Sequence, residues 1–169
     1  PPAAPAPAET PNRPTVSRQF EKLQNPQQWL EAKLVDFQHT VFIADSMPFI
    51  HPDLGANYLA CLAGAGIRYD EEQAWILPSL ARWNEIPELQ TLSKSSSFLK
   101  MQELTNILLE SISGQAVFMP PNLGSPIDAL MNLTGAEKFC QMLIDQPKEV
   151  KSALSQIADI WKSTYSEIM

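Results

Sequence analysis

The clearest pattern in this chain is a short apolar run that stops at a loop and is followed by a helix start. Residues 116–119 are apolar and end at two prolines, and the loop 122–124 leads into Ser125 and Pro126. A serine hydroxyl can accept a backbone N–H of the first helical turn, and proline in that turn gives up an N–H that has no partner. The pattern predicts a strand, a short loop and a helix, with the loop where α/β proteins hold ligands.

Apolar periodicity and capping residues predict the other elements. Asn25 before Pro26 starts a helix, and Thr134 with Glu137 is expected to form a capping box that starts another. In addition to the helix that begins at Pro126, helices are predicted over residues 26–39, 56–63, 98–112, 135–144 and 147–169. Buried strands are predicted at 41–44 and 116–119, and one or two short strands over 67–77 around a charged turn.

Helices and strands that alternate along the chain indicate an α/β protein with a mainly parallel sheet. Two convincing buried strands are too few for a closed barrel of roughly 250 residues. The chain is therefore either a small open sheet or part of something larger. Residues 1–19 are rich in proline and alanine without apolar periodicity, so we expect a flexible arm there.

Charge and composition narrow the function classes. The net charge is −7 and only four of twelve basic residues are arginines. A nucleic-acid surface needs clustered lysine and arginine, so we expect no nucleic-acid partner. No apolar run approaches the roughly 20 residues of a membrane span, so we expect no membrane partner. Cys61 and Cys140 lie in apolar helical contexts and are predicted to be buried thiols of a reducing, cytoplasmic compartment.

The first candidate site residues follow the predicted strand at 41–44. Asp45 comes directly after it, where a carboxylate can act as a general acid or base, although a turn or helix cap is the alternative. His51 and Asp53 lie two residues apart in a loop and could share a metal or a proton. A single pair of this kind is a weak signal, and a loop histidine often only binds backbone.

Further candidates lie near the starts of two helices. Asn57 precedes a short helix, and Asn122 and Asp128 flank the start of the helix at Pro126. Asn122 can meet a ligand but also forms turns, and Asp128 is more easily explained as a capping group. Trp29, Trp75, Trp83 and Trp161 are interpreted as packing residues. No Ser/His/Asp arrangement, phosphate-binding loop or dinucleotide fingerprint occurs.

Three segments resemble the uroporphyrinogen decarboxylase-like superfamily. They are NPQQWLEAKLVDF, FIADSMPFIHPDLGANYLACLAGAGIRYDEEQAWI and GQAVFMPPNLGSPIDALMNLTGAEKFCQMLIDQPKEVKSAL. The superfamily includes the decarboxylase and cobamide-dependent methyltransferases, all on (β/α)8 TIM barrels. The resemblance implies that residues 20–169 are the N-terminal half of such a barrel, with Asp45 as the acidic site residue. It implies a small-molecule substrate or corrinoid as ligand, and zinc ligands in the half that is missing here.

Two departures argue against porphyrinogen decarboxylation. The family enzyme has an arginine-bearing segment near its N-terminus, and no counterpart is found here. It also has a tyrosine where this chain has Met131 or Leu133. A chain of charge −7 is a poor receptor for a polyanion. The resemblance therefore favours a methyltransferase-type or uncharacterised branch, in which this chain alone is inactive without the other half or a second chain.

A non-catalytic interaction module is the alternative. In that case the Pro-rich arm tethers a small α/β domain to a partner with an acidic surface. The two readings differ in what they leave exposed. A module covers every apolar stripe, whereas a half-barrel leaves open strand edges and apolar faces that need a partner.

Overall fold

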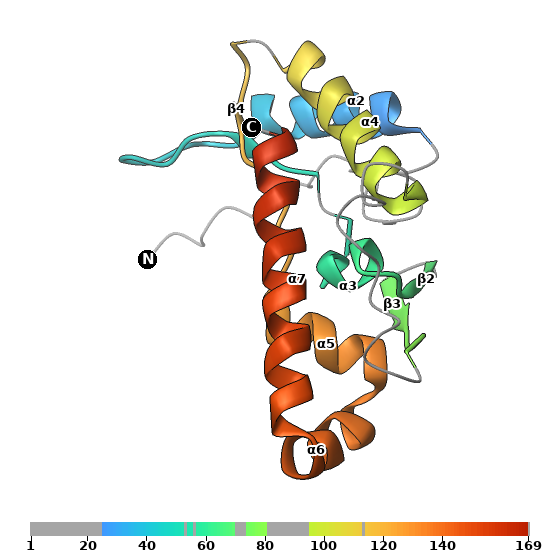
Figure 1. Ribbon diagram of the computed structural model, residues 1–169. Helices are drawn as coiled ribbons and strands as arrows, with labels where there is room; N and C mark the ends of the chain where they lie inside the picture. The colour runs from blue at the N-terminus through green and yellow to red at the C-terminus, as the bar shows by residue number, and fades with distance from the viewer. Residues whose placement is uncertain are drawn as a thin grey trace, which may run out of the picture.

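The computed structural model describes residues 25–52, 54–55, 57–69, 74–80, 95–112 and 114–168 (Figure 1). Within these ranges the chain runs through α2 (Pro26–Gln38), β1 (Phe49–Ile50), α3 (Tyr58–Leu62), β2 (Gly66–Tyr69), β3 (Ala74–Leu77), α4 (Ser96–Ser111), β4 (Val117–Phe118), α5 (Pro126–Thr134), α6 (Ala136–Asp145) and α7 (Pro147–Ile168). None of the described helices has both the length and the apolarity needed to cross a membrane.

The strands form two small sheets. β1 and β4 pair in parallel, with Phe49 opposite Val117 and Ile50 opposite Phe118. β2 and β3 form an antiparallel hairpin, so the one or two short strands predicted over 67–77 are two. Parallel neighbours need a crossover connection, and here the chain passes through α3, the hairpin and α4 between β1 and β4. The fold is thus α/β with a short parallel sheet.

The core lies where α3, α5 and α7 meet. α7 runs along the length of the molecule beside α3 and α5 (Figure 1). One leucine or isoleucine from each helix, Leu59, Leu130 and Ile157, has no exposed surface. The hairpin joins this core through hydrogen bonds of 3.0 Å from the backbone N–H groups of Ser79 and Leu80 to the carbonyl of Leu133. Burial of this apolar surface is the main force that holds the helices together.

Within the described part of the chain, the parallel ribbon of β1 and β4 is covered on one face only. Ile50 is buried and Phe118 is half-buried against the core. Strand side chains alternate between faces, so Phe49, Val117 and Met119 point the other way. Their exposed fractions are 52%, 47% and 44%. We call these three residues the open face. Parallel sheets are normally covered on both faces, so this surface is one that calls for a partner.

The predicted helix starts at Asn25 and Ser125 are confirmed, and Ser95 caps the start of α4. Ser95 Oγ accepts the Phe98 N–H at 3.0 Å, and Asn25 Oδ1 accepts the Gln28 N–H at 3.3 Å. Ser125 Oγ accepts the Asp128 N–H at 3.2 Å. Each bond satisfies one of the N–H groups that a helix leaves unpaired at its start.

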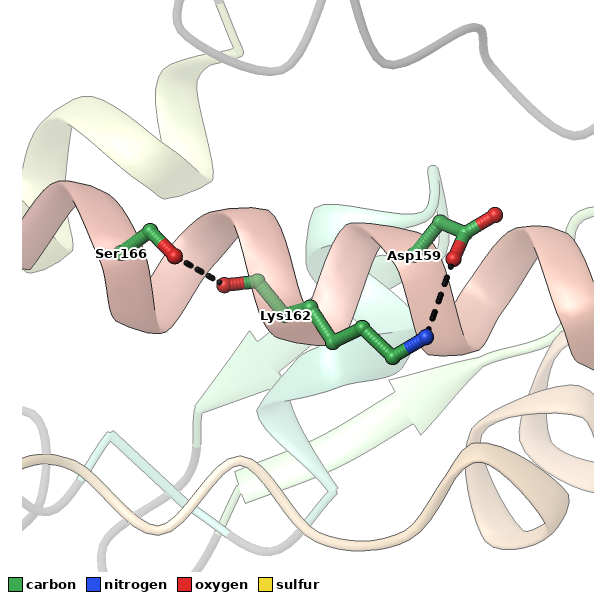
Figure 2. A network of polar contacts seen from close by, with 3 residues as sticks. All are labelled: Asp159, Lys162 and Ser166. Atoms are coloured by element: carbon green, nitrogen blue, oxygen red, sulfur yellow. Dashed lines mark hydrogen bonds and ion pairs between the residues drawn. The ribbon is translucent and has the colours of Figure 1, made fainter.

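The last helix begins at Pro147 as predicted, and its buried residues are Val150, Ala153, Ile157, Ile160 and Thr164. Trp161 is 36% exposed, whereas Thr164 is fully buried. Threonine is tolerated inside because its hydroxyl donates to the Ile160 carbonyl at 2.8 Å. On the exposed side, Lys162 Nζ lies 3.4 Å from Asp159 Oδ1, and Ser166 Oγ donates to the Lys162 carbonyl at 3.0 Å (Figure 2). Such an exposed ion pair stabilises little.

The buried strand predicted at 41–44 is wrong. Val41 and Ile43 are 83% and 75% exposed, and the chain turns at Ala44, whose φ is 55°. Ser46 Oγ accepts the Ile43 N–H and donates to the Ile43 carbonyl, both at 2.7 Å. This local bonding replaces the ladder of a strand. The strand instead forms after Pro48, at Phe49–Ile50, in a segment predicted to be a loop.

Two smaller predictions are also corrected. Thr134 and Glu137 do not form a capping box, because Thr134 is the last residue of α5 and its hydroxyl donates to the Leu130 carbonyl at 2.9 Å. The cap of α6 is Gly135, with a φ of 85°. Cys61 is a buried free thiol as expected, but Cys140 is exposed.

The packing role predicted for the tryptophans holds for Trp29, which is 5% exposed. Trp75 and Trp161 are 45% and 36% exposed, which corrects the expectation that they lie in the core. Trp83 lies outside the described residues.

Replacement of the α5 cap gives the first test. We predict that Ser125→Ala lowers the free energy of unfolding by about 1 kcal/mol, because the Asp128 N–H loses its acceptor. Ser155→Ala, at an exposed position of α7, is the matched control and changes it by less than about 0.5 kcal/mol. Urea unfolding followed by circular dichroism measures both. Equal effects of the two substitutions would contradict the capping role.

Candidate ligand site at the carboxyl ends of the parallel strands

His51 directly follows β1, at the edge where β4 also ends. The Met119 N–H donates to the Ile50 carbonyl at 2.9 Å, which aligns the ends of the two strands. The carboxyl ends of neighbouring parallel strands lie at one edge, where α/β proteins bind ligands. His51 therefore occupies the position that the sequence had suggested for Asp45.

The loop after β1 and the loop after β4 both leave this edge, and they contact each other closely. The Leu59 N–H donates to the carbonyl of Leu123, which is fully buried, at 3.0 Å. A Cβ atom on Gly124 would lie 2.8 Å from Asn57 Oδ1 and 3.2 Å from Asn57 Cα. Gly124 has a φ of +82°, so glycine is required both by conformation and by contact. This contact brings the loop after β1 against the loop after β4.

Asn122 and Asp128 bind their own loop and helix. Asn122 is exposed, and its Oδ1 accepts the Gly124 N–H at 3.0 Å, an Asx turn. Asp128 is half-buried, and its Oδ2 accepts the Ser125 hydroxyl at 2.7 Å in the first turn of α5. The amide nitrogen of Asn122 donates no hydrogen bond in the described part of the chain, whereas Asp128 acts as a capping group.

The imidazole of His51 is half-buried and stacks on Phe49. The ring centroids are 6.4 Å apart and the planes differ by 16°. Its Nδ1 atom is buried without a hydrogen-bond partner in the described part of the chain. A buried polar atom that makes no hydrogen bond costs free energy, so its presence calls for a reason. Proton exchange with a bound ligand is one role that an imidazole at this position can fill.

Asp45 lies at the other end of β1. It is exposed in the turn at Ala44, four residues before the strand begins. The position that motivated its catalytic role belonged to the predicted strand at 41–44, which is not present. The role of Asp45 stays a prediction without that support, and Asp53 lies outside the described residues.

In the described ranges, no three His, Cys, Asp or Glu side chains lie close enough together to hold a metal ion. The described residues therefore do not fit a zinc site.

A buried pair lies behind the site and was not identified from the sequence as one unit. The Tyr58 hydroxyl donates to the Ser97 carbonyl at 2.9 Å and ties α3 to the start of α4. Burial raises the pKa of the Cys61 thiol to about 12. Burial, and then the neighbouring Cys61, raise the pKa of Tyr58 well above its usual value. Both groups stay neutral at physiological pH and serve packing.

A local signal for the true strand was present in the sequence. Phe49 and Ile50 form a second apolar pair after Pro48, and proline is tolerated just before a strand. The contact between Gly124 and Asn57 has a weaker signal, because a glycine in a loop does not reveal which segment approaches it.

A comparison with solved structures finds a likeness to a methyltransferase from Methanosarcina mazei, with a TM-score of 0.58 and 13% sequence identity. The likeness covers 70% of this chain and 37% of that methyltransferase, so the chain spans little more than a third of its length. At this identity the likeness shows the fold alone. No family model matches the chain, and no curated protein matches it.

The contact between the two loops gives the second test. We predict that Gly124→Ala lowers the free energy of unfolding by about 1–2 kcal/mol through strain in the left-handed backbone conformation. The clash of the new Cβ with Asn57 should lower it by at least about 1 kcal/mol more. Gly114→Ala is the control, because its φ is +74° and no described atom lies within 4 Å of the new Cβ. Adding Asn57→Gly to Gly124→Ala should restore part of the loss. Equal destabilisation by the two alanine variants would show that the loops do not touch.

The thiols give the third test. We predict that a thiol-alkylating reagent modifies Cys140 in the folded chain and spares Cys61, which is buried and stays protonated up to a pKa of about 12. Mass spectrometry should find one adduct per chain at pH 8 and still one at pH 9, and two after unfolding in urea. Two adducts on the folded chain would contradict the burial of Cys61.

Proposed function

We propose that this chain is the N-terminal part of a (β/α)8 barrel enzyme of the uroporphyrinogen decarboxylase-like superfamily, of a methyltransferase-type or uncharacterised branch. The observation that carries the proposal is the parallel ribbon. Its two strands are joined by a helical crossover and covered by helices on one face, while Phe49, Val117 and Met119 are left exposed on the other.

This is the arrangement expected of barrel strands taken without the rest of the barrel. Each strand of a (β/α)8 barrel has helices outside and packed side chains inside. On this proposal the open face belongs to the barrel interior. The last turns of α7 return to β4, where the Tyr165 hydroxyl donates to the Pro121 carbonyl at 2.7 Å. A further strand would then pair with the free edge of the ribbon, supplied by the same or a second polypeptide.

The ligand site of the proposed enzyme lies at the carboxyl ends of β1 and β4. His51 would hold or move a proton at the reacting ligand, and Asn122 would donate from its amide. Asn57 would contribute mainly through packing against Gly124. The left-handed backbone of Asn57 and this close contact hold both loops in position. Phe49 and Met119 supply an apolar wall beside these polar groups, as in most small-molecule sites.

Charge supports methyl transfer over porphyrinogen decarboxylation. A substrate with many carboxylates needs several cationic partners, and the net charge of this chain is −7. Arg68 is the one arginine among the described residues, and it lies on the separate hairpin of β2 and β3. In the related methyltransferases a zinc ion and a cobamide take part. The zinc ligands would come from the rest of the barrel.

A compact interaction module is less well supported. Such a module would cover its apolar surface, but Val41, Ile43, Phe49 and Met47 are each more than half exposed. This surface is larger than isolated exposed side chains would explain.

The activity test uses the longest polypeptide encoded around this chain. We predict that it transfers the methyl group of methylcobalamin to a thiol, followed by the absorbance change of the corrinoid and the mass of the thioether. His51→Gln should lower the rate at least about a hundredfold, because general acid–base catalysis contributes about 10²–10⁴-fold. The chain has only two histidines, and His39→Gln at the exposed end of α2 is the matched control.

A parallel assay offers uroporphyrinogen and measures release of carbon dioxide. Carbon dioxide release without methyl transfer would overturn the branch proposed here. Equal effects of His51→Gln and His39→Gln on methyl transfer would remove His51 from the site.

A further inference from the structure

Residues 41–47 form an ordered apolar projection. In Figure 1 this segment extends away from the helices, to the left of α7. Its base is fixed by edge-to-face packing of Phe42 on Phe37, with ring centroids 6.1 Å apart. Its tip is closed by the bonds of Ser46 to Ile43. A segment held in this way presents a defined surface, and we call it the projection.

The surface of the projection is apolar along its sides and polar at its tip. Val41, Ile43 and Met47 are 83%, 75% and 56% exposed. The tip consists of a turn at Ala44 and Asp45. A loop that inserts into a lipid surface enters with apolar residues first, and an aspartate at the tip opposes this. The sides of the projection therefore suit a protein surface that lies along them.

Connectivity places the projection at the amino ends of the parallel strands. It leads directly into β1, and the Val117 N–H at the start of β4 donates to the Pro48 carbonyl at 2.9 Å. Met47 is exposed and lies two residues before Phe49, so exposed apolar side chains continue along the chain from the projection to the open face. The ligand site, at His51, lies at the opposite end of the same strands.

We propose that the projection closes the amino-terminal end of the barrel by packing Val41, Ile43 and Met47 against the strands that complete it. This inference rests on the proposed function, because the occupant is the rest of the barrel. The chain spans 37% of the methyltransferase that it resembles in fold. Most of such a barrel would therefore be formed by residues outside the region of structural similarity. The continuity with the open face selects this occupant over a second copy of the chain.

The test compares two substitutions of the same kind in two lengths of polypeptide. Ile43→Asp places a carboxylate on the projection, and Ile144→Asp places one on α6, where Ile144 is 81% exposed. In the longest polypeptide encoded around this chain, Ile43→Asp should lower the melting temperature by about 5 °C or more, because the charge becomes buried. Ile144→Asp should change it by less than about 2 °C. In the 169-residue chain neither substitution should matter, because both positions are exposed.

Three results would overturn the inference. The first is an unchanged melting temperature of the long polypeptide with Ile43→Asp, while Met119 is protected there from oxidation. That result would leave the barrel proposal standing and remove only the role of the projection. The second is a dimer by light scattering that Ile43→Asp converts to a monomer, which would make the occupant a second copy. The third is an equal loss of stability in the short chain. If Ile43→Asp prevents folding of the long polypeptide, Ile43→Ser gives the same comparison with a milder change.

Discussion

The positions of the open face and of the candidate ligand site both follow from the parallel pairing of β1 with β4. Two strands of two residues each cannot be stable in water alone, so the ribbon is held by what covers it. The core of α3, α5 and α7 covers the face that carries Ile50 and Phe118. The other face is apolar and exposed. This asymmetry leads to the proposal of a barrel, because a barrel strand has helices outside and other strands' side chains inside.

The same pairing determines where ligand chemistry can take place. Because both strands run the same way, His51 and the loop at 120–124 leave from one edge. The close contact of Gly124 with Asn57 then holds the two loops together. A site built on loops that are fixed to each other is better ordered than loops that move independently. The opposite end of the strands carries the projection, so the ligand-binding end and the closed end of the proposed barrel are separate.

Elements with local causes could be predicted from the sequence, and those with long-range causes could not. Ser125 and Pro126 predict the start of α5 because capping is decided within one helical turn. The prediction of a strand at 41–44 was wrong because apolar, β-prone residues occur both in buried strands and on exposed surfaces that bind a partner. The burial of Thr164 and the partial exposure of Trp161 on α7 reflect the shape of the core. Asp45 was placed by the wrong strand, whereas His51 and Asn122 lie in loops as their residue types and neighbours predict, and their roles at a ligand site stay predictions.

The most direct test of the barrel proposal is oxidation of methionines by hydrogen peroxide, measured residue by residue by mass spectrometry. Met119 is 44% exposed on the open face, and Met101 of α4 is fully buried and serves as the internal reference. We expect Met119 to react readily in the 169-residue chain and to be protected, like Met101, in the longest polypeptide encoded around it. Equal reactivity of Met119 in both polypeptides would show that the open face stays in water, which contradicts the barrel.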